Sequence, residues 1–499
     1  MPGQPAHRYP LFSYTTEEED SLPPIRKIIS IAVLTLLVGA GAAYLAGVRL
    51  EVDGTGSRPI LKYGTRSTHD EELERNRQKQ RGSATTPVAS EPVTSPAPVP
   101  APDAVKGDRP VAVTDAYWGD FRGPGRLGVY AQTSILTTWP SAGLKRLWRQ
   151  PIGGGYASFV VANNTAFTIE QRRSKEAVAA YDLLSGKERW TNSWDADFRE
   201  SMGGDGPRAT PVWHDNNIYA MGAEGELRVI QATTGETVWR KNILQDTGAS
   251  NLQWGMSASP LIVDDRVIVL PGGSKGRSVV AYNKSTGERI WGSLDDKQAY
   301  TSPMLMQLAG KRQVVAVTAE RLVGLDPADG KLLWEQPWKT EYDVNSAQPI
   351  PTGPNTLFIS AGYGHGAALL EIAVQGSGYA ARQVWFSNRM KNKFNSSALY
   401  NGYLYGLDEG ILACIDARTG EQKWKGGRYG YGQLLLAGDH IVLITEGGEL
   451  VLIKATPDRH QELARFQAIE GKTWNNPAIS NGILLVRNTT EMAAFQLAP

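Results

Sequence analysis

From residue 144 to the C-terminal end, the chain consists of short stretches in which apolar and polar residues alternate. Residues 216–221, 265–270 and 402–407 are typical of them, and a stretch with Ser/Thr-Pro precedes many, as at residues 210–211 and 302–303. Alternation with a period of two predicts β-strands with one buried face. The stretches occur in groups of four, so the pattern predicts an all-β chain made of four-stranded units.

Most units end in the same sequence motif, apolar-x-apolar-Asp-x-x-Thr-Gly-Glu/Lys-x-x-Trp, which is called the word below. Its Asp and Gly predict a tight turn, because Gly adopts positive φ without strain, and its Trp can fill the space between sheets. The tryptophans are Trp148, Trp190, Trp239, Trp291, Trp334, Trp385 and Trp424, separated by 42, 49, 52, 43, 51 and 39 residues, and the turn glycines are Gly186, Gly235, Gly287, Gly330 and Gly420. A four-stranded unit repeated every 40–50 residues or so predicts a β-propeller in which these residues are structural.

The units number eight when two degenerate words, at 369–385 and 450–466, are counted. The last unit has three strands and no terminal Trp strand. Residues 144–149, which contain Trp148, look like the missing outer strand, so we expect them to pair with residues 491–495 and close the ring. In the alternative, 144–149 is an unrelated leading strand and the ring has seven full blades.

An uncharged run of 21 residues, 28–48, is long enough to span a bilayer. A cleaved signal peptide is the competing interpretation, because residues 40–42 form a small-x-small site. The acidic tail at 1–27 and the length of the apolar run favour an uncleaved transmembrane helix. Basic residues on its two sides are nearly balanced, so charge leaves the orientation open.

Residues 49–110 are densely charged at first and then rich in Pro and Ala, which predicts a disordered stalk between the span and a propeller at 111–499. The formal net charge of +1 gives no sign of a nucleic-acid surface. Cys414 is the single cysteine, which excludes an internal disulfide.

The repeated word resembles the pyrroloquinoline quinone (PQQ)-type propeller repeat over residues 117–497, and residues 118–128 resemble the lead-in of propellers similar to the outer-membrane β-barrel assembly factor. Such a resemblance implies one of two functional classes. Quinoprotein dehydrogenases hold PQQ and Ca²⁺ in the central funnel, whereas the other propellers are non-catalytic and bind protein partners. The tryptophan word serves blade packing in both classes.

The loops before the first strand of each blade are expected to meet at one mouth of the ring. If the chain is a quinoprotein, Asp205, Arg208 and Asp343 are the catalytic candidates there, and Trp254, Asn345 and Trp474 are the residues that could hold the cofactor. Trp254 would stack on the quinone, and Asp343 and Asn345 would offer oxygen atoms to the ion. Turn-rich loops collect Asn, Asp and Gly for structural reasons as well, and no metal motif occurs in the sequence.

The sequence therefore predicts a membrane-anchored, eight-bladed propeller that needs no cofactor and acts as a binding scaffold in envelope or outer-membrane protein assembly. It would be held by residues 28–48 in the bacterial inner membrane, face the periplasm and bind other envelope proteins, but not nucleic acid. The first alternative is a PQQ- and Ca²⁺-dependent alcohol or sugar dehydrogenase. The second is a propeller that binds an envelope polysaccharide.

Overall fold

The computed structural model describes residues 24–52, 59–63, 66–82 and 117–499. They form two compact units. One unit contains helix α1 (Pro24–Leu45) and most of a hairpin of β1 (Val48–Val52) and β2 (Pro59–Tyr63). The other contains helix α2 (Arg66–Gly82) and the propeller. Residues 1–23 of the expected tail at 1–27 and the Pro/Ala-rich part of the expected stalk, 86–110, lie outside the described residues.

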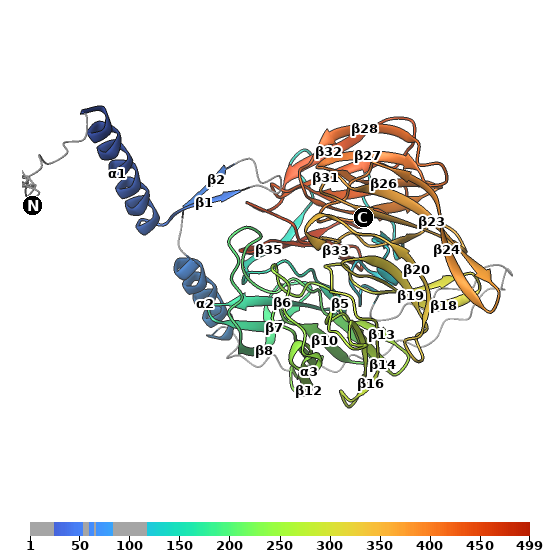
Figure 1. The fold of residues 1–499 in the computed structure, drawn as a ribbon. Helices are drawn as coiled ribbons and strands as arrows, with labels where there is room; N and C mark the ends of the chain where they lie inside the picture. Colours follow the sequence, from blue (N-terminus) through green and yellow to red (C-terminus); the bar gives the residue numbers. More distant parts are fainter. Residues whose placement is uncertain (1–23, 53–58, 64–65, 83–116) are drawn as a thin grey trace, which may run out of the picture. The chain divides into compact units, whose positions relative to one another are not determined.

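Eight four-stranded antiparallel blades make up the propeller (Figure 1), which confirms the predicted architecture. Blades I and II are β5 (Val160–Ala162), β6 (Thr165–Arg172), β7 (Lys175–Asp182), β8 (Glu188–Asp195) and β9 (Val212–His214), β10 (Asn217–Met221), β11 (Glu226–Gln231), β12 (Thr237–Asn242). Blades III and IV are β13 (Leu261–Val263), β14 (Arg266–Val269), β15 (Val279–Asn283), β16 (Arg289–Ser293) and β17 (Met304–Leu308), β18 (Lys311–Val317), β19 (Arg321–Leu325), β20 (Leu332–Pro337).

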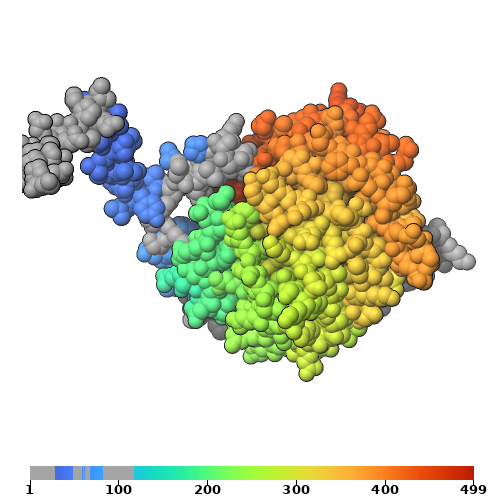
Figure 2. Space-filling view, in the orientation of Figure 1, coloured from blue at the N-terminus to red at the C-terminus, as the bar shows by residue number. Residues whose placement is uncertain are grey.

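Blades V and VI are β21 (Ile350–Pro351), β22 (Thr356–Ala361), β23 (Gly366–Gln375), β24 (Gly378–Ser387) and β25 (Ala398–Tyr400), β26 (Tyr403–Asp408), β27 (Ile411–Asp416), β28 (Gln422–Arg428). Blades VII and VIII are β29 (Gln433–Ala437), β30 (His440–Ile444), β31 (Glu449–Lys454), β32 (Glu462–Gln467) and β33 (Ala478–Ser480), β34 (Ile483–Arg487), β35 (Glu491–Gln496), β4 (Arg146–Pro151). A short helix α3 (Ile243–Thr247) and 3₁₀ turns at Pro124–Arg126 and Glu341–Asp343 lie in the connections. The colours in Figure 2 follow the sequence around the face, so consecutive blades are neighbours.

The outer strand of blade VIII is β4, supplied from the N-terminal side of the propeller. It pairs antiparallel with β35, and Trp148 lies opposite Ala494. The expected ring closure is therefore confirmed, although the strand spans 146–151 rather than 144–149. Closure leaves no three-stranded sheet whose unpaired edge could attract another chain.

A tryptophan on the outer strand of one blade contacts the turn of the next blade at five junctions. A Cβ atom added to the turn glycine would lie 2.5–2.9 Å from the indole ring, and each glycine has positive φ. The pairs are Trp148–Gly186, Trp190–Gly235, Trp239–Gly287, Trp291–Gly330 and Trp385–Gly420. The indole N–H also donates to a turn carbonyl, for example from Trp239 to Lys284 O at 2.9 Å. One word thus provides the Trp for one junction and the Gly for the preceding junction.

Trp334 departs from this pattern. Its indole N–H donates to Gln313 Oε1 of its own blade at 2.5 Å, and its ring lies against Gly324, the residue opposite it on β19. The corresponding turn of blade V contains Gly376, but a Cβ atom there would meet nothing within 4 Å, so no indole ring packs on it. Gly324 leaves the room that Ala, Val, Leu or Cys fills in the corresponding strand of other blades.

A β-bulge interrupts the pairing between the third and outer strands in all eight blades. In most blades the extra residue directly precedes the Trp, as Val238 precedes Trp239. Bulges twist an outer strand and so discourage edge-to-edge pairing.

The segment at 117–130 fills the centre of the ring. Its strand β3 (Val129–Tyr130) pairs in parallel with β29 of blade VII. Arg126 donates to Pro303 O at 2.8 Å and Arg122 to Ser397 O at 2.9 Å, and both arginines are buried. Burial lowers the pKa of Arg122 to about 10. The predicted lead-in is thus a plug that contacts the inner strands of blades I–IV, VI and VII.

Helix α2 lies where the sequence predicted a disordered stalk, so that prediction is wrong for residues 66–82. Glu, Arg, Gln and Leu favour helix, and Glu71 and Arg75 form an i,i+4 ion pair at 3.9 Å. Within this densely charged segment, Leu73 and Arg77 are each only 1% exposed, so one side of the helix is packed and not solvated.

Candidate functional site at the mouth of the ring

The loops that precede the first strand of each blade lie at one end of the ring, here called the mouth. Strands within a blade are antiparallel, so the hairpins between second and third strands lie at this end too. The turns that carry the Gly of each word lie at the opposite end. The mouth is therefore built from segments that do not belong to the repeated word.

Short hydrogen bonds between neighbouring loops form the throat of the mouth. Ser302 Oγ accepts from the backbone N–H of Ser259 at 2.9 Å, and Gln348 Oε1 accepts from that of Ser302 at 2.9 Å. The same contact joins Ser158 to Thr210 and Gln348 to Ser396. At Thr210-Pro211 and Ser302-Pro303, the hydroxyl before the proline therefore links one blade to the blade before it, whereas Ser259 Oγ of Ser259-Pro260 is buried without a hydrogen-bond partner. The Ser/Thr-Pro pairs were visible in the sequence, but the alternation of apolar and polar residues did not show that the hydroxyl bonds to the neighbouring blade.

Aromatic side chains from loops of several blades form a cluster at the mouth that we call the aromatic arc. The arc runs through Tyr342, Tyr363, Phe394, Trp474 and Tyr156, and Tyr431 packs beside Phe394. Neighbouring ring centroids are 4.8–6.5 Å apart, within the usual range for aromatic pairs. Tyr342 is 66% exposed, whereas Tyr431 is buried. The arc thus presents a partly exposed apolar surface on rigid supports.

Two lysines cover parts of the arc. Lys393 Nζ lies 4.5 Å from the ring centroid of Tyr363, and Lys472 Nζ lies 4.4 Å from that of Trp474. Lys472 also donates to Gly203 O at 3.2 Å. Such cation–π contacts fix the ammonium groups beside the rings, so the surface is cationic as well as aromatic.

The structure places Asp205 and Arg208 in one loop, where both hold the loop itself. Asp205 Oδ1 accepts from the backbone N–H of Glu200 at 3.1 Å. Arg208 donates to Gly204 O at 2.5 Å, and its guanidinium lies 4.7 Å from the ring centroid of Phe198. Burial lowers the pKa of Arg208. These groups are engaged in positioning the chain rather than directed together at one point.

Most of the remaining candidates gather around Tyr300, whose backbone N–H donates to Asn345 O at 2.9 Å. Trp254 and Tyr300 have ring centroids 5.8 Å apart. Burial raises the pKa of Tyr300 to about 12, and the charges of Arg208 and Asp343 shift it in opposite directions. Asp343 Oδ2 is 3.9 Å from Lys297 Nζ. Asn345 is buried and its Nδ2 donates to Thr318 O at 3.0 Å. Trp474, far along the arc, donates to Glu446 Oε1 at 2.9 Å.

These contacts do not fit a calcium–quinone site. Ca²⁺ requires six to eight oxygen ligands or so. Asn345 Oδ1 is buried without a hydrogen-bond partner, but the nearest candidate carboxylate, Asp343, faces a lysine. Within residues 24–52, 59–63, 66–82 and 117–499, no three His, Cys, Asp or Glu side chains gather in a way that could hold a metal.

Residues 174–426, slightly more than half of the chain, match the family described as the outer membrane protein assembly factor BamB. The chain belongs to this family. It is 21% identical over 308 residues to BamB of Bordetella pertussis, with 59% of this chain and 72% of the relative covered. Against BamB of Shewanella oneidensis, identity is 22% over 316 residues, with 59% and 75% covered.

Solved structures agree on the fold. The crystal structure of BamB from Moraxella catarrhalis has a TM-score of 0.51 and 17% identity, and the match covers 71% of this chain and all of that one. A europium-containing methanol dehydrogenase has a TM-score of 0.46 and 12% identity, with 75% and 90% covered, too distant a likeness to bear on activity. The resemblance drawn from the tryptophan word and the lead-in is confirmed for the BamB family.

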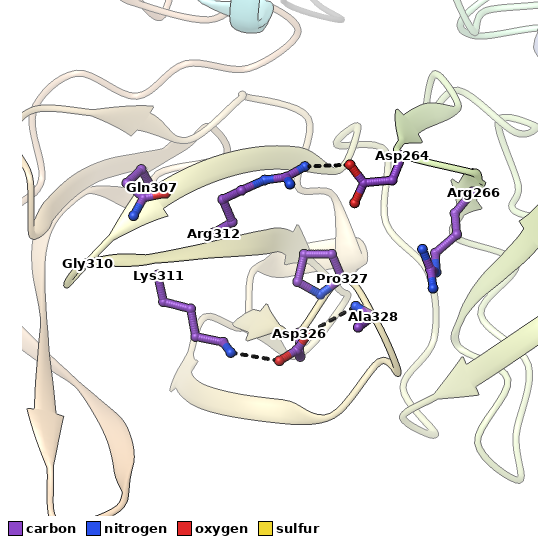
Figure 3. Close-up of a pocket in the computed structure, with 9 residues that line it drawn as sticks. All are labelled: Asp264, Arg266, Gln307, Gly310, Lys311, Arg312, Asp326, Pro327 and Ala328. Carbon is purple, nitrogen blue, oxygen red and sulfur yellow. Dashed lines mark hydrogen bonds and ion pairs between the residues drawn. The ribbon is translucent and has the colours of Figure 1, made fainter.

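A hollow of about 470 Å³ between blades III and IV of this BamB-family chain lies away from the mouth (Figure 3). Arg312 pairs with Asp264 at 3.1 Å and Lys311 with Asp326 at 2.8 Å, as the dashed lines in Figure 3 show. Exposed pairs of this kind contribute little to stability. Because these charges neutralise each other, the hollow has no evident chemistry.

Proposed function

We propose that this chain is a non-catalytic scaffold for outer membrane protein assembly, attached to the inner membrane with its propeller in the periplasm. The aromatic arc carries the proposal, because it offers partly exposed rings and fixed cations on a rigid throat. Aromatic side chains that keep one exposed face are typical of protein-binding surfaces. Membership of a family named for outer membrane protein assembly points to other envelope proteins as partners.

Attachment to the membrane is supported by α1. Residues 28–45 have a mean hydropathy of 2.3 and are exposed nearly throughout, as expected of a helix that spans a bilayer. The helix spans 24–45, against the expected 28–48, and a signal sequence near the N-terminus would share its length and composition. The mass of the protein isolated from membranes distinguishes the two, because cleavage near residue 42 removes the helix.

The absence of catalysis is supported by the contacts of the candidate carboxylates. Asp205 accepts from the backbone and Asp343 faces Lys297, so neither is directed at a common reacting point. A general base must lie within hydrogen-bond reach of the proton that it removes. Addition of PQQ and Ca²⁺ to the purified protein should therefore give neither a quinone spectrum nor alcohol-dependent dye reduction. Either signal would overturn the non-catalytic assignment.

Partner binding at the mouth is tested by photo-crosslinking in cells from position 342. Tyr342 and Leu184 are similarly exposed, at 66% and 64%, but Leu184 lies at the opposite end of the ring and is the matched control. We expect a photoreactive residue at 342 to capture a component of outer membrane protein assembly, identified by mass spectrometry, and one at 184 to capture none. Equal capture at both positions, or capture only at 184, would exclude the mouth as the partner surface. Capture of polysaccharide at 342 would favour the polysaccharide-binding alternative.

A further inference from the structure

Helix α2 presents one continuous stripe to the propeller. Residues 69, 73, 76, 77 and 80 follow the spacing of three and four that places side chains on one helix face. Leu73 and Arg77 on this stripe are buried, whereas Arg75, two residues away, has a side chain that is 61% exposed. The stripe is polar apart from Leu73, so specific hydrogen bonds rather than apolar area determine where the helix sits.

The seat of α2 lies across the seam where the ring closes, between β4 of blade VIII and β8 of blade I. On the blade VIII side, His69 Nε2 is 2.8 Å from Ile152 O, Arg77 donates to Pro151 O at 2.8 Å, and Asn76 donates to Gln150 Oε1 at 3.1 Å. Ile152 and Pro151 mark the end of the closing strand. One end of the stripe therefore holds the strand that completes the last blade.

On the blade I side, the backbone N–H of Glu188 donates to Gln80 Oε1 at 3.0 Å. Arg77 Nε is 3.2 Å from Glu188 Oε2, and the same guanidinium donates to Tyr181 Oη at 3.2 Å and lies 5.0 Å from the centroid of that ring. Figure 1 shows α2 beside β7 and β8. Arg77 thus bonds to both blades at once.

The seat is chemically matched to an arginine. Beneath Arg77 lies a buried network in which Tyr181 donates to Glu170 Oε1 at 2.5 Å and Arg172 is 2.6 Å from Glu188. Burial opposes ionisation of Glu170, but the charges of Arg172, Arg77 and Arg487 outweigh it and lower its pKa to about 2. A buried carboxylate that loses a cationic partner is strongly disfavoured. The planar guanidinium also holds its five N–H donors in a fixed fork that suits a carbonyl and a carboxylate on different sides, whereas an ammonium group is a compact point charge without that geometry.

We propose that the seam between blades VIII and I is a docking surface for α2, and that α2 acts as a clasp that holds the ring closed, with Arg77 as its central contact. Both elements at the seam, α2 and β4, come from the N-terminal side of the propeller. Residues 66–82, which lie between α1 and the ring in the sequence, are therefore part of the ring's closure. This inference is independent of what the mouth binds.

The test is hydrogen–deuterium exchange on the full chain in detergent, with Arg77→Ala compared with Arg75→Ala. The two variants remove the same side chain from the same helix, at a buried and an exposed position. We expect Arg77→Ala to raise exchange in β4 and β8 by about tenfold, as local opening of a cooperative segment does. Exchange in blade IV, on the other side of the ring, should stay as in the wild type, and Arg75→Ala should match the wild type everywhere.

A second variant keeps the test decisive if Arg77→Ala does not fold. Arg77→Lys retains the positive charge but not the planar arrangement of N–H donors. We therefore expect a smaller rise in exchange, confined to β4 and β8. Added peptide of residues 66–82 should restore protection in the Arg77→Lys protein, and the same peptide with Ala at position 77 should not. Unchanged exchange in β4 and β8, equal effects of Arg77→Ala and Arg75→Ala, or a rise spread evenly over all blades would each overturn the clasp.

Discussion

The outer rim and the mouth of the propeller join neighbouring blades by different means. At the rim, one contact is repeated: a tryptophan of one blade lies on the turn glycine of the next, as Trp239 lies on Gly287. At the mouth, the hydrogen bonds of the throat recur, but the other side-chain hydrogen bonds between neighbouring blades differ from one junction to the next. Glu176 Oε1 accepts from Ala223 N–H between blades I and II, whereas Gln433 Nε2 donates to Phe394 O and Trp474 O. The rim therefore sets the blade geometry, and the mouth is free to vary.

Loss of the closing strand should have the largest effect on the rim. A chain that begins at Gln150 lacks Trp148 and most of β4, so blade VIII is left with three strands and Gly186 loses its indole partner. It also lacks the plug at 117–130, so we expect it to unfold as a whole, because the ring loses both the plug and the closure that links its two ends. A chain that begins at Tyr117 retains β4 and should remain folded, with a lower melting temperature because α2 is missing. Calorimetry of both chains checks this, and equal melting would show that closure by β4 is unimportant.

Removal of one rim tryptophan should cause the next largest loss of stability. Trp239→Ala removes the ring from Gly287 and the hydrogen bond to Lys284 O, so we expect about 3–5 kcal/mol of destabilisation, as for other large aromatic truncations. Val238 is 53% exposed in the adjacent bulge, and Val238→Ala should change stability by less than about 0.5 kcal/mol. Urea denaturation measures both. If the Trp239→Ala protein were as stable as the Val238→Ala protein, the contact between Trp239 and Gly287 would not stabilise the packing of neighbouring blades.

The same contrast explains what could be predicted from the sequence. Rim residues repeat, so Trp and Gly could be recognised from their spacing, and the count of blades followed. Arg122 and Arg126 occur once and act through carbonyls more than 100 residues away, and no local pattern encodes such contacts. For the same reason, the contacts of Arg77 with Pro151, Tyr181 and Glu188 could not be predicted from the charged segment around it. At the mouth, Asp205, Asp343 and Asn345 could be located but not their partners, because loop geometry decides whether a carboxylate meets a backbone N–H, a lysine or an ion.

Glu176, whose carboxyl group accepts the hydrogen bond from Ala223 at the mouth, should make the stability of the protein depend on pH. Burial raises the pKa of Glu176 to about 7, although the hydrogen bond from Ala223 N–H acts in the opposite direction. The unfolded chain releases this proton near the ordinary value of 4.5, so the contribution of Glu176 to stability is present below pH 4.5 or so and is lost as pH rises to about 7. Glu176→Gln keeps the acceptor for Ala223 and cannot ionise. We expect the variant to gain up to about 3 kcal/mol on the wild type between pH 4.5 and 8, and a gap that does not change with pH would contradict the buried, protonated state.

Substitution of a turn glycine should have the smallest effect and separates two causes. Gly287 and Gly310 have φ of 73° and 78°, but a Cβ atom at 287 would lie 2.8 Å from Trp239 Cε3, whereas one at 310 meets nothing within 4 Å. Gly310→Ala should therefore cost about 1 kcal/mol for the left-handed backbone alone, and Gly287→Ala about 2 kcal/mol because the ring must also move. In the Trp239→Ala background, the cost of Gly287→Ala should fall to about 1 kcal/mol, since no ring remains to be displaced. A cost at 287 that is the same with and without Trp239 would mean that the glycine is required only by its backbone angle. The contact between the Trp of one word and the Gly of the next would then not explain why both are repeated.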